Sequence, residues 1–139
     1  MINQRDVIRM KIPYPSVSSE LAVSSHMYIC YDADRPNYAF VKCQTMKPSQ
    51  IINNLMKHYC DEIPDINRNP FARPTRIDCD KLFRSSGVDY DDRLVTDRRR
   101  SVSEDLFQDV SVQLNADGYC EIRLNENDLV KINPLITWI

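Results

Sequence analysis

Two stretches of this chain decide its fold: His26-Met-Tyr-Ile-Cys-Tyr-Asp32 and Ala39-Phe-Val-Lys-Cys-Gln-Thr45. Both are rich in β-branched and aromatic residues, and Ala33-Asp-Arg-Pro-Asn37 between them has the composition of a turn. We expect two antiparallel strands, because consecutive strands usually pair. The start of the first strand then lies beside the end of the second, which predicts His26 and Thr45 on one rim of the sheet.

The flanking sequence predicts further elements around this pair. Asp6-Val-Ile-Arg-Met-Lys-Ile12 has the pattern of an earlier strand, joined to the pair by a polar connection that begins at Pro13. We expect four later elements: a helix from Lys47-Pro48 to Cys60, a strand over 75–80, a helix from a Ser103 cap to Leu114, and a strand over 119–124. Residues 85–92 are expected to form a loop, and the apolar tail 128–139 to be strand-like before Pro134. Leu135, Ile136, Trp138 and Ile139 of this tail are expected to dock on the body of the protein or on a second subunit.

The composition is that of one globular domain. The chain has 139 residues, of which 42% are hydrophobic and 27% charged. No apolar run reaches the roughly 20 residues that span a bilayer, and the residues after Met1 lack the apolar core of a signal peptide. We therefore expect a single domain over 1–139, without a membrane segment and located in the cytoplasm.

The cysteines and glycines narrow the class of function. There are five cysteines and no Cys-x-x-Cys, and the two histidines, His26 and His58, are not spaced for a zinc site. This favours buried free thiols and predicts no metal. With only Gly87 and Gly118, the chain has neither a glycine-rich phosphate loop nor a Gly-x-Ser-x-Gly elbow. No cofactor is therefore expected.

Charge is distributed unevenly along the chain. The net charge is −2, which disfavours a large basic surface for duplex DNA. Residues 1–60 hold 7 Lys and Arg against 4 Asp and Glu, whereas the rest holds 11 against 16. The half with the three early strands is thus the cationic one, and a local basic groove is expected there.

The ordered set of motifs resembles the PemK/MazF family of toxin endoribonucleases from bacterial toxin–antitoxin pairs. The opening strand at Asp6, the His26 strand and the strand ending at Thr45 are similar to the first three strands of that family. Arg76-Ile-Asp-Cys-Asp80 resembles an Arg-Cys-Asp-Gln strand of PemK-type members, and 103–114 resembles the closing helix. Two departures are that no Gly precedes Asp6 and that Ser25 stands where the family has a catalytic Arg.

The resemblance implies a fold, an activity and a site. The implied fold is α+β but mainly β: a small SH3-like barrel of the CcdB/PemK type, with a curved antiparallel sheet and two or three helices. The implied activity is metal-independent cleavage of single-stranded RNA by a homodimer that an antitoxin inhibits. Cleavage needs a base for the 2′-hydroxyl, an acid for the leaving oxygen and donors for the phosphorane. The catalytic candidates are His26, Thr45 and Asp80. The candidates for substrate binding are Ser25, Gln44, Lys47, Arg73 and Arg76.

Two alternatives remain open. The chain is also compatible with a catalytically inactive relative that binds RNA or a protein, because the family Arg is missing. It is compatible, thirdly, with an inhibitor of a protein target such as gyrase, like the CcdB toxins that share the barrel, because a fold does not specify a function. Asp80 also has a structural interpretation as a turn cap before Lys81, and the run Arg98-Arg-Arg100 is expected to face solvent.

Overall fold

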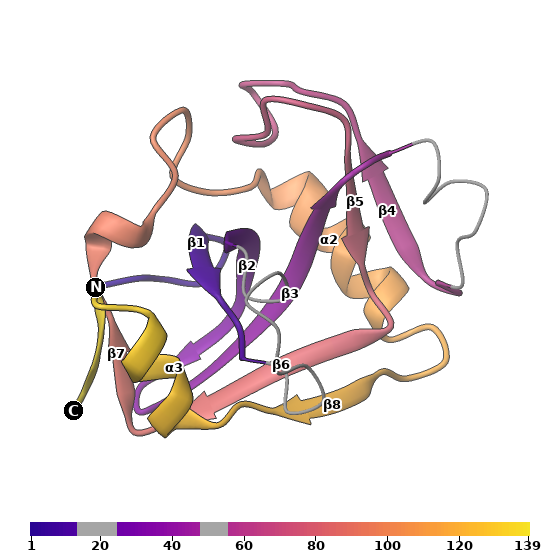
Figure 1. Cartoon of the computed structure of the whole chain (residues 1–139). Coiled ribbons are helices and arrows are strands. Elements are labelled where there is room, and N and C mark those ends of the chain that lie inside the picture. Colours follow the sequence, from indigo (N-terminus) through magenta and orange to yellow (C-terminus); the bar gives the residue numbers. More distant parts are fainter. Residues whose placement is uncertain (14–24, 48–55) are drawn as a thin grey trace.

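The computed structural model describes residues 1–13, 25–47 and 56–139, and these form a main sheet, a small second sheet and two helices (Figure 1). The strands of the main sheet are β1 (Val7–Lys11), β2 (Ser25–Asp34), β3 (Asn37–Thr45), β4 (Tyr59–Glu62), β5 (Thr75–Asp78), β6 (Lys81–Ser86) and β8 (Cys120–Arg123). The second sheet pairs β7 (Val88–Tyr90) with β9 (Ile136–Trp138), and the helical elements are the 3-10 turn η2 (Asp92–Leu94), α2 (Glu104–Leu114) and α3 (Glu126–Ile132).

The main sheet is built around the long strand β3. Its order is β1-β2-β3-β5-β4, and the other half of β3 pairs with β6, which in turn pairs with β8. Every pair is antiparallel except β6–β8, which is parallel. The prediction of an α+β, mainly β protein is confirmed. The sheet is not closed into a barrel.

The β2–β3 pair has the predicted geometry. Met27 lies opposite Cys43 and Tyr28 opposite Lys42, so the start of β2 is beside the end of β3. On its other side β2 pairs with β1, and Arg9 is the partner of Met27. Three strand ends therefore meet at this rim of the sheet.

Side chains of the sheet enter two cores, one on each face, as alternation along a strand requires. On one face, Val41 and Ile77 pack against Leu106, Val110 and Leu114 of α2. On the other face, Tyr28 and Phe40 pack against elements near the C-terminus: Val88 and Tyr90 of β7, Leu129 of α3 and Ile136 of β9. Figure 1 shows α2 behind the sheet and α3 at the side where both termini lie.

Helix α2 begins where the sequence predicts. The Ser103 hydroxyl accepts a hydrogen bond from the Leu106 amide (3.2 Å), and Glu104 and Asp105 occupy the first turn. Such a cap satisfies one of the amides that a helix start leaves without a partner.

Several other elements differ from the predictions. The helix expected to end at Cys60 lies partly outside the described residues, over 48–55, but Tyr59 and Cys60 belong to strand β4, where pairing with β5 determines their conformation. The expected loop 85–92 contains β7. The tail begins with a helix, α3, capped by Asn125, and its strand β9 follows Pro134 rather than preceding it.

The tail docks in part on the body of the protein. Ile136 is buried in the core and Leu135 is half-buried. Trp138 and Ile139 are 53% and 55% exposed.

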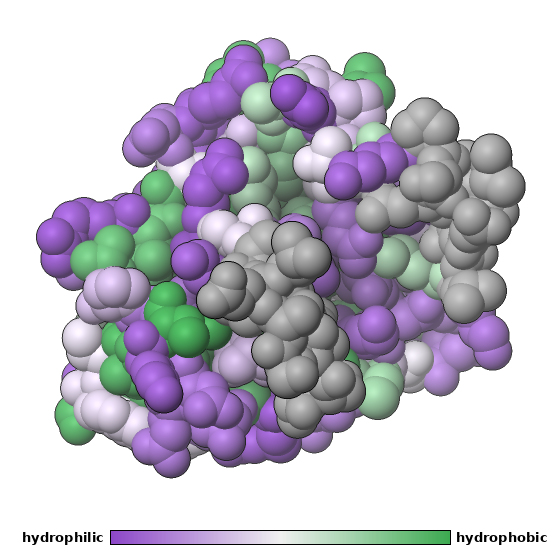
Figure 2. Space-filling model, viewed as in Figure 1, coloured by the Kyte–Doolittle hydropathy of each residue, from purple (hydrophilic) through white to green (hydrophobic). Residues whose placement is uncertain are grey.

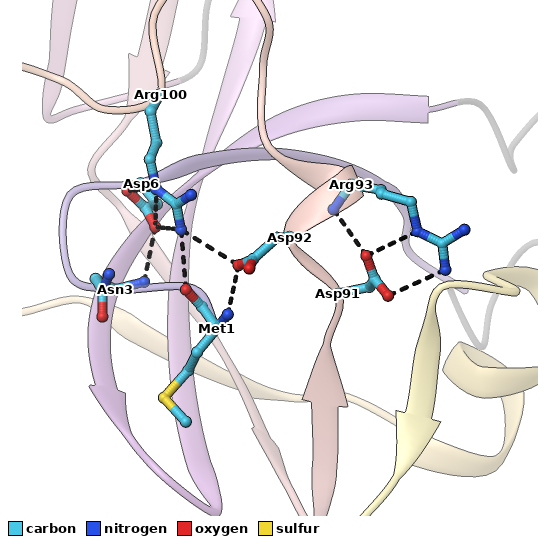
Figure 3. A network of polar contacts seen from close by, with 7 residues as sticks. All are labelled: Met1, Asn3, Asp6, Asp91, Asp92, Arg93 and Arg100. Carbon is cyan, nitrogen blue, oxygen red and sulfur yellow. Dashed lines mark hydrogen bonds and ion pairs between the residues drawn. The ribbon is translucent and has the colours of Figure 1, made fainter.

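The outer edge of β1 is covered by a segment from the second half of the chain. Val7 N donates to Arg100 O (2.9 Å), and Thr96 N donates to Val7 O (3.0 Å). The buried Asp6 carboxylate accepts hydrogen bonds from the Arg100 guanidinium and from Asn3 N, and Figure 3 shows Arg100 reaching Asp92 and the Met1 carbonyl as well. Arg98 and Arg100 are exposed as predicted, although Arg100 is also held by these contacts. Arg99 is half-buried and donates to Ser101 O, which departs from the prediction.

Two further observations bear on the predicted class. Within residues 1–13, 25–47 and 56–139, none of the helices has the length and apolar character that a membrane-spanning helix requires. All five cysteines are free; Cys30, Cys43 and Cys79 are buried as expected, but Cys60 is half-buried and Cys120 is exposed.

Candidate functional site

A pocket of about 230 Å³ lies at the rim where β1, β2 and β3 end. Its lining combines two arginines, a histidine, three hydroxyl side chains, a thiol and two apolar side chains: Arg9, Ser25, His26, Met27, Cys43, Thr45, Ala72, Arg73 and Thr75. Four residues predicted for the site, Ser25, His26, Thr45 and Arg73, are brought together here. Among the described residues, the charged side chains of the lining are two arginines, and the lining includes no carboxylate.

Local structure explains why these side chains meet. The residues Arg9, Met27 and Cys43 lie in a row across three paired strands. Thr75 at the start of β5 pairs with Thr45 at the end of β3, and its hydroxyl donates to Arg73 O (2.8 Å). The Thr75 bond holds the backbone of the loop before β5, and Arg73 is thereby brought to the pocket.

Arg9 and Arg73 differ from most arginines in having no partner among the residues that the structure describes. In the described ranges, eight arginines form hydrogen bonds or ion pairs: Arg35, Arg68, Arg76, Arg84, Arg93, Arg99, Arg100 and Arg123. Arg9 and Arg73 are exposed, and neither makes such a contact with any described residue. Two exposed guanidinium groups in one pocket are suited to bind an anion, and phosphate above all.

His26 is half-buried at this rim. Burial lowers its pKa, and the positive charges of Lys42 and Lys47 lower it further. At neutral pH the imidazole is therefore neutral and able to accept a proton. Side chains alternate between the two faces along β2. The His26 side chain therefore leaves the sheet on the same face as Lys42, opposite to Ser25 and Met27.

Gln44 and Lys47 are close to the pocket in sequence but do not line it. Gln44 is half-buried opposite Arg76, and Lys47 is exposed just after β3. The effect of Lys47 on His26 is electrostatic, as the lowered pKa of the imidazole indicates.

Arg76 is committed to a structural pair. Its guanidinium donates two hydrogen bonds of 2.7 Å to Asp61 and lies 3.9 Å from the centre of the Tyr59 ring. Only 12% of its side chain is exposed. The surface seen beside β4 and β5, on the face away from α2, is largely hydrophilic (Figure 2). Arg76 pairs with Asp61 and does not line the pocket.

Asp80 does not line the pocket either. Its carboxylate accepts the backbone amides of Lys57 (2.8 Å) and His58 (3.0 Å), and so it holds the residues that lead into β4. The expected convergence of Asp80 with His26 and Thr45 is therefore not found, because β5 runs away from the pocket between Thr75 and Asp80. The turn-cap interpretation is also wrong, because the carboxylate accepts amides of a distant segment; in this turn it is Asp78 that accepts the amide of Asp80 (2.9 Å).

Arg9 is a pocket residue that sequence reasoning missed. The signal was present, since Arg9 lies in the first strand and the β1–β2 pairing brings it opposite Met27, next to Ser25 and His26. A register for the first two strands would have identified it. Thirteen residues, 12–24, separate β1 from β2 in the sequence, and a connection of that length does not fix the register of the two strands.

The donor set is that of an anion site rather than a metal site. Over the described ranges, no three or more His, Cys, Asp or Glu side chains are grouped so that they could hold a metal ion.

No protein-family model matches the chain, and no curated protein is significantly similar to it.

Proposed function

We propose that this protein is a metal-independent endoribonuclease that binds single-stranded RNA at the pocket formed by the ends of β1, β2 and β3. The observation that carries the proposal is that two exposed guanidinium groups, Arg9 and Arg73, line one pocket with Thr45 and Ser25 and have no partner among the described residues. A phosphodiester needs cationic donors of this kind, and hydroxyl groups add neutral donors to its oxygens.

The proposed chemistry is attack of a ribose 2′-oxygen on the adjacent phosphorus. Neutral His26 takes the 2′-hydroxyl proton, and the P–O bond to the 5′-oxygen breaks as the new P–O bond forms. Arg9 and Arg73 offset the negative charge that grows on the phosphorane, while Thr45 donates to a non-bridging oxygen. Solvent protonates the departing oxygen, which leaves a 2′,3′-cyclic phosphate and a 5′-hydroxyl end.

Membership of the PemK/MazF family is part of this proposal. It is supported by the ordered motifs and by the pocket beside Thr45, the residue similar to the Thr or Ser that ends the third strand of the family. The open sheet departs from the SH3-like barrel that the resemblance implies. Arg9 compensates for the arginine that Ser25 replaces, because both positions line the same pocket. An antitoxin as inhibitor, a homodimer and a cytoplasmic location belong to the same proposal.

The test is cleavage of single-stranded RNA by the full chain in EDTA, with analysis of the product ends. We expect Arg9→Gln and Arg73→Gln each to lower kcat/KM about 10- to 100-fold, since a hydrogen bond to a charged group contributes about 1.5–3 kcal/mol. Arg98→Gln is the matched control, because Arg98 is exposed, unpaired within the described ranges and absent from the pocket lining. Unchanged cleavage by the Arg9→Gln/Arg73→Gln double variant would remove the pocket from the reaction.

A second candidate is an RNA-binding protein that does not cleave. It is favoured by Asp80, whose carboxylate accepts the amides of Lys57 and His58 away from the pocket, so that no carboxylate of the described residues accompanies His26 in the lining. Binding that requires Arg9 and Arg73, together with an absence of cyclic-phosphate products from any RNA, would select this candidate.

A further inference from the structure

Two cysteines lie side by side at the edge of the main sheet, apart from the pocket. Cys60 of β4 pairs with Ile77 of β5, and Cys79 follows two residues later on the same face. The Cys79 amide donates to His58 O (3.0 Å), which extends the β4–β5 ladder to this position. Cys60 and Cys79 are thus diagonal neighbours across two paired strands, and both pack in the core beneath α2.

The two thiols affect each other's ionisation. The Cys79 thiol donates a hydrogen bond to Ile77 O (3.7 Å). Interaction with the neighbouring Cys79 thiol lowers the pKa of Cys60, although burial and the nearby Asp109 oppose the change. Interaction with Cys60, together with burial, raises the pKa of Cys79. Cys60 is therefore the better nucleophile of the two.

Cys60, whose pKa is lowered, is also the more exposed of the two cysteines. Cys60 is half-buried at the margin of the core, whereas Cys79 is buried within it. Neighbouring thiols with one partly exposed, activated member have the arrangement of an oxidisable pair, in which the second thiol resolves what forms on the first.

We propose that Cys60 and Cys79 form a peroxide-reactive dithiol, a site of reversible oxidative modification on the β4–β5 pair. The Cys60 thiolate attacks one peroxide oxygen, the O–O bond breaks, and with one proton the products are Cys60 sulfenic acid and water. The Cys79 thiol then attacks the Cys60 sulfur and releases a second water, its own proton leaving with the hydroxyl. Hydrogen peroxide is reduced by two electrons, and the two thiols are oxidised to a disulfide.

The other cysteines lack this combination of features. Burial, together with Asp6 and Asp32, raises the pKa of Cys30 to about 12. Cys43 is fully buried, and its pKa is raised by burial. Cys120 is exposed on β8. It is the reference cysteine for the variants described below.

The disulfide would join strand β4, which ends the sheet, to the turn between β5 and β6. It closes the loop from residue 60 to residue 79, so that the unfolded chain loses conformational freedom. For a loop and a domain of this size, we expect oxidation to raise Tm by roughly 5–10 °C, and dithiothreitol to reverse the change.

Peptide mapping tests the pairing directly. The full chain is treated with a small excess of hydrogen peroxide, its free thiols are alkylated, and it is digested with trypsin without reduction. Cleavage after Lys57, Arg68, Arg76 and Lys81 places Cys60 in peptide 58–68 and Cys79 in peptide 77–81. We expect these two peptides as one species, two hydrogen masses below their sum, which separates when dithiothreitol is added.

Two variants complete the test. Cys120→Ser keeps the pair and is expected to give the linked peptides and the rise in Tm, whereas Cys60→Ser is expected to give neither. Should Cys60→Ser fold poorly, the map of the wild-type chain decides alone. Sulfinic acid at Cys60 without linked peptides, or a disulfide only through Cys120, would overturn the proposal. The outcome is independent of RNA cleavage, because neither cysteine lines the pocket.

Discussion

His26 shows how a small change of surroundings decides what a residue can do. Burial is the main reason that its pKa is lowered, and Lys42 and Lys47 add to the effect. The folded protein therefore binds a proton at His26 less readily than the unfolded chain does. Between the lowered pKa and the ordinary value of 6.5, the unfolded chain holds more protons, so His26 makes the fold less stable as the pH falls through that window.

We expect Lys47→Gln to raise the pKa of His26, because it removes an exposed positive charge that disfavours the imidazolium. The acidic limb of kcat/KM against pH should move to higher pH in the same variant, since more alkali is then needed to keep the base neutral. Proton NMR measures the pKa directly, and the chain has only one other histidine, His58, to assign.

The control for this prediction is Lys131→Gln, on α3 and not among the charges that affect His26. An unchanged His26 pKa in Lys47→Gln would mean that the lysine charge does not reach the imidazole. A changed pKa with an unchanged rate profile would exclude His26 as the base.

At the scale of elements, Asp80 links two strands rather than serving the pocket. Its carboxylate receives the amides of Lys57 and His58, which lead into β4, while its own residue ends the turn between β5 and β6. We expect Asp80→Ala to lower the free energy of unfolding by about 1–2 kcal/mol, since two amides lose their acceptor. Urea unfolding measures the loss.

RNA cleavage by folded Asp80→Ala should stay within about threefold of wild type, because Asp80 lies outside the pocket lining. Asp80→Asn, which keeps one acceptor oxygen, is the matched variant and should lose less stability. A hundredfold loss of cleavage with normal stability would instead return Asp80 to the chemistry.

Elements with a strong and local pattern were predictable from the sequence. The strands β1, β2 and β3 show continuous or alternating apolar residues, and α2 has both a cap and an apolar face, so all four were found. Strand β4 was not, because it has four residues and depends on its partner β5 for its conformation. Helix α3 was missed although Asn125 caps it, since Val130 and Ile132 gave the segment a strand-like composition.

The residues of the candidate site also divide into those that a local pattern predicts and those that it does not. The meeting of His26, Ser25 and Thr45 follows from a hairpin, which the sequence shows directly. The position of Arg73 depends on the pairing of Thr45 with Thr75, across a gap of 30 residues for which no local pattern exists. The role of Asp80 was not foreseeable from residue types, because its partners are backbone amides.

At the scale of the whole molecule, the net charge is −2, whereas the proposed ligand, RNA, is a polyanion. The proposed RNA binding therefore depends on a few local cations, and the salt dependence of the affinity measures how many phosphates they neutralise. For single strands, log K falls with log salt concentration by about 0.7 for each phosphate neutralised. We expect Arg9→Gln and Arg73→Gln each to reduce the slope by about 0.7, as measured by fluorescence anisotropy with a labelled RNA.

Arg98→Gln again provides the control and should leave the slope unchanged. A steep slope that persists in the Arg9→Gln/Arg73→Gln double variant would locate RNA on another surface.

The segment 95–102, which covers the edge of β1, has a consequence for the synthesis of the protein on the ribosome. The outer edge of β1 receives its backbone partners from residues that are synthesised some ninety positions later. While the ribosome is still translating that part of the message, the first strand has an uncovered edge, which is the kind of surface on which incomplete chains associate. Synthesis must therefore pass residue 102 before the nascent protein is protected from its neighbours on a polysome.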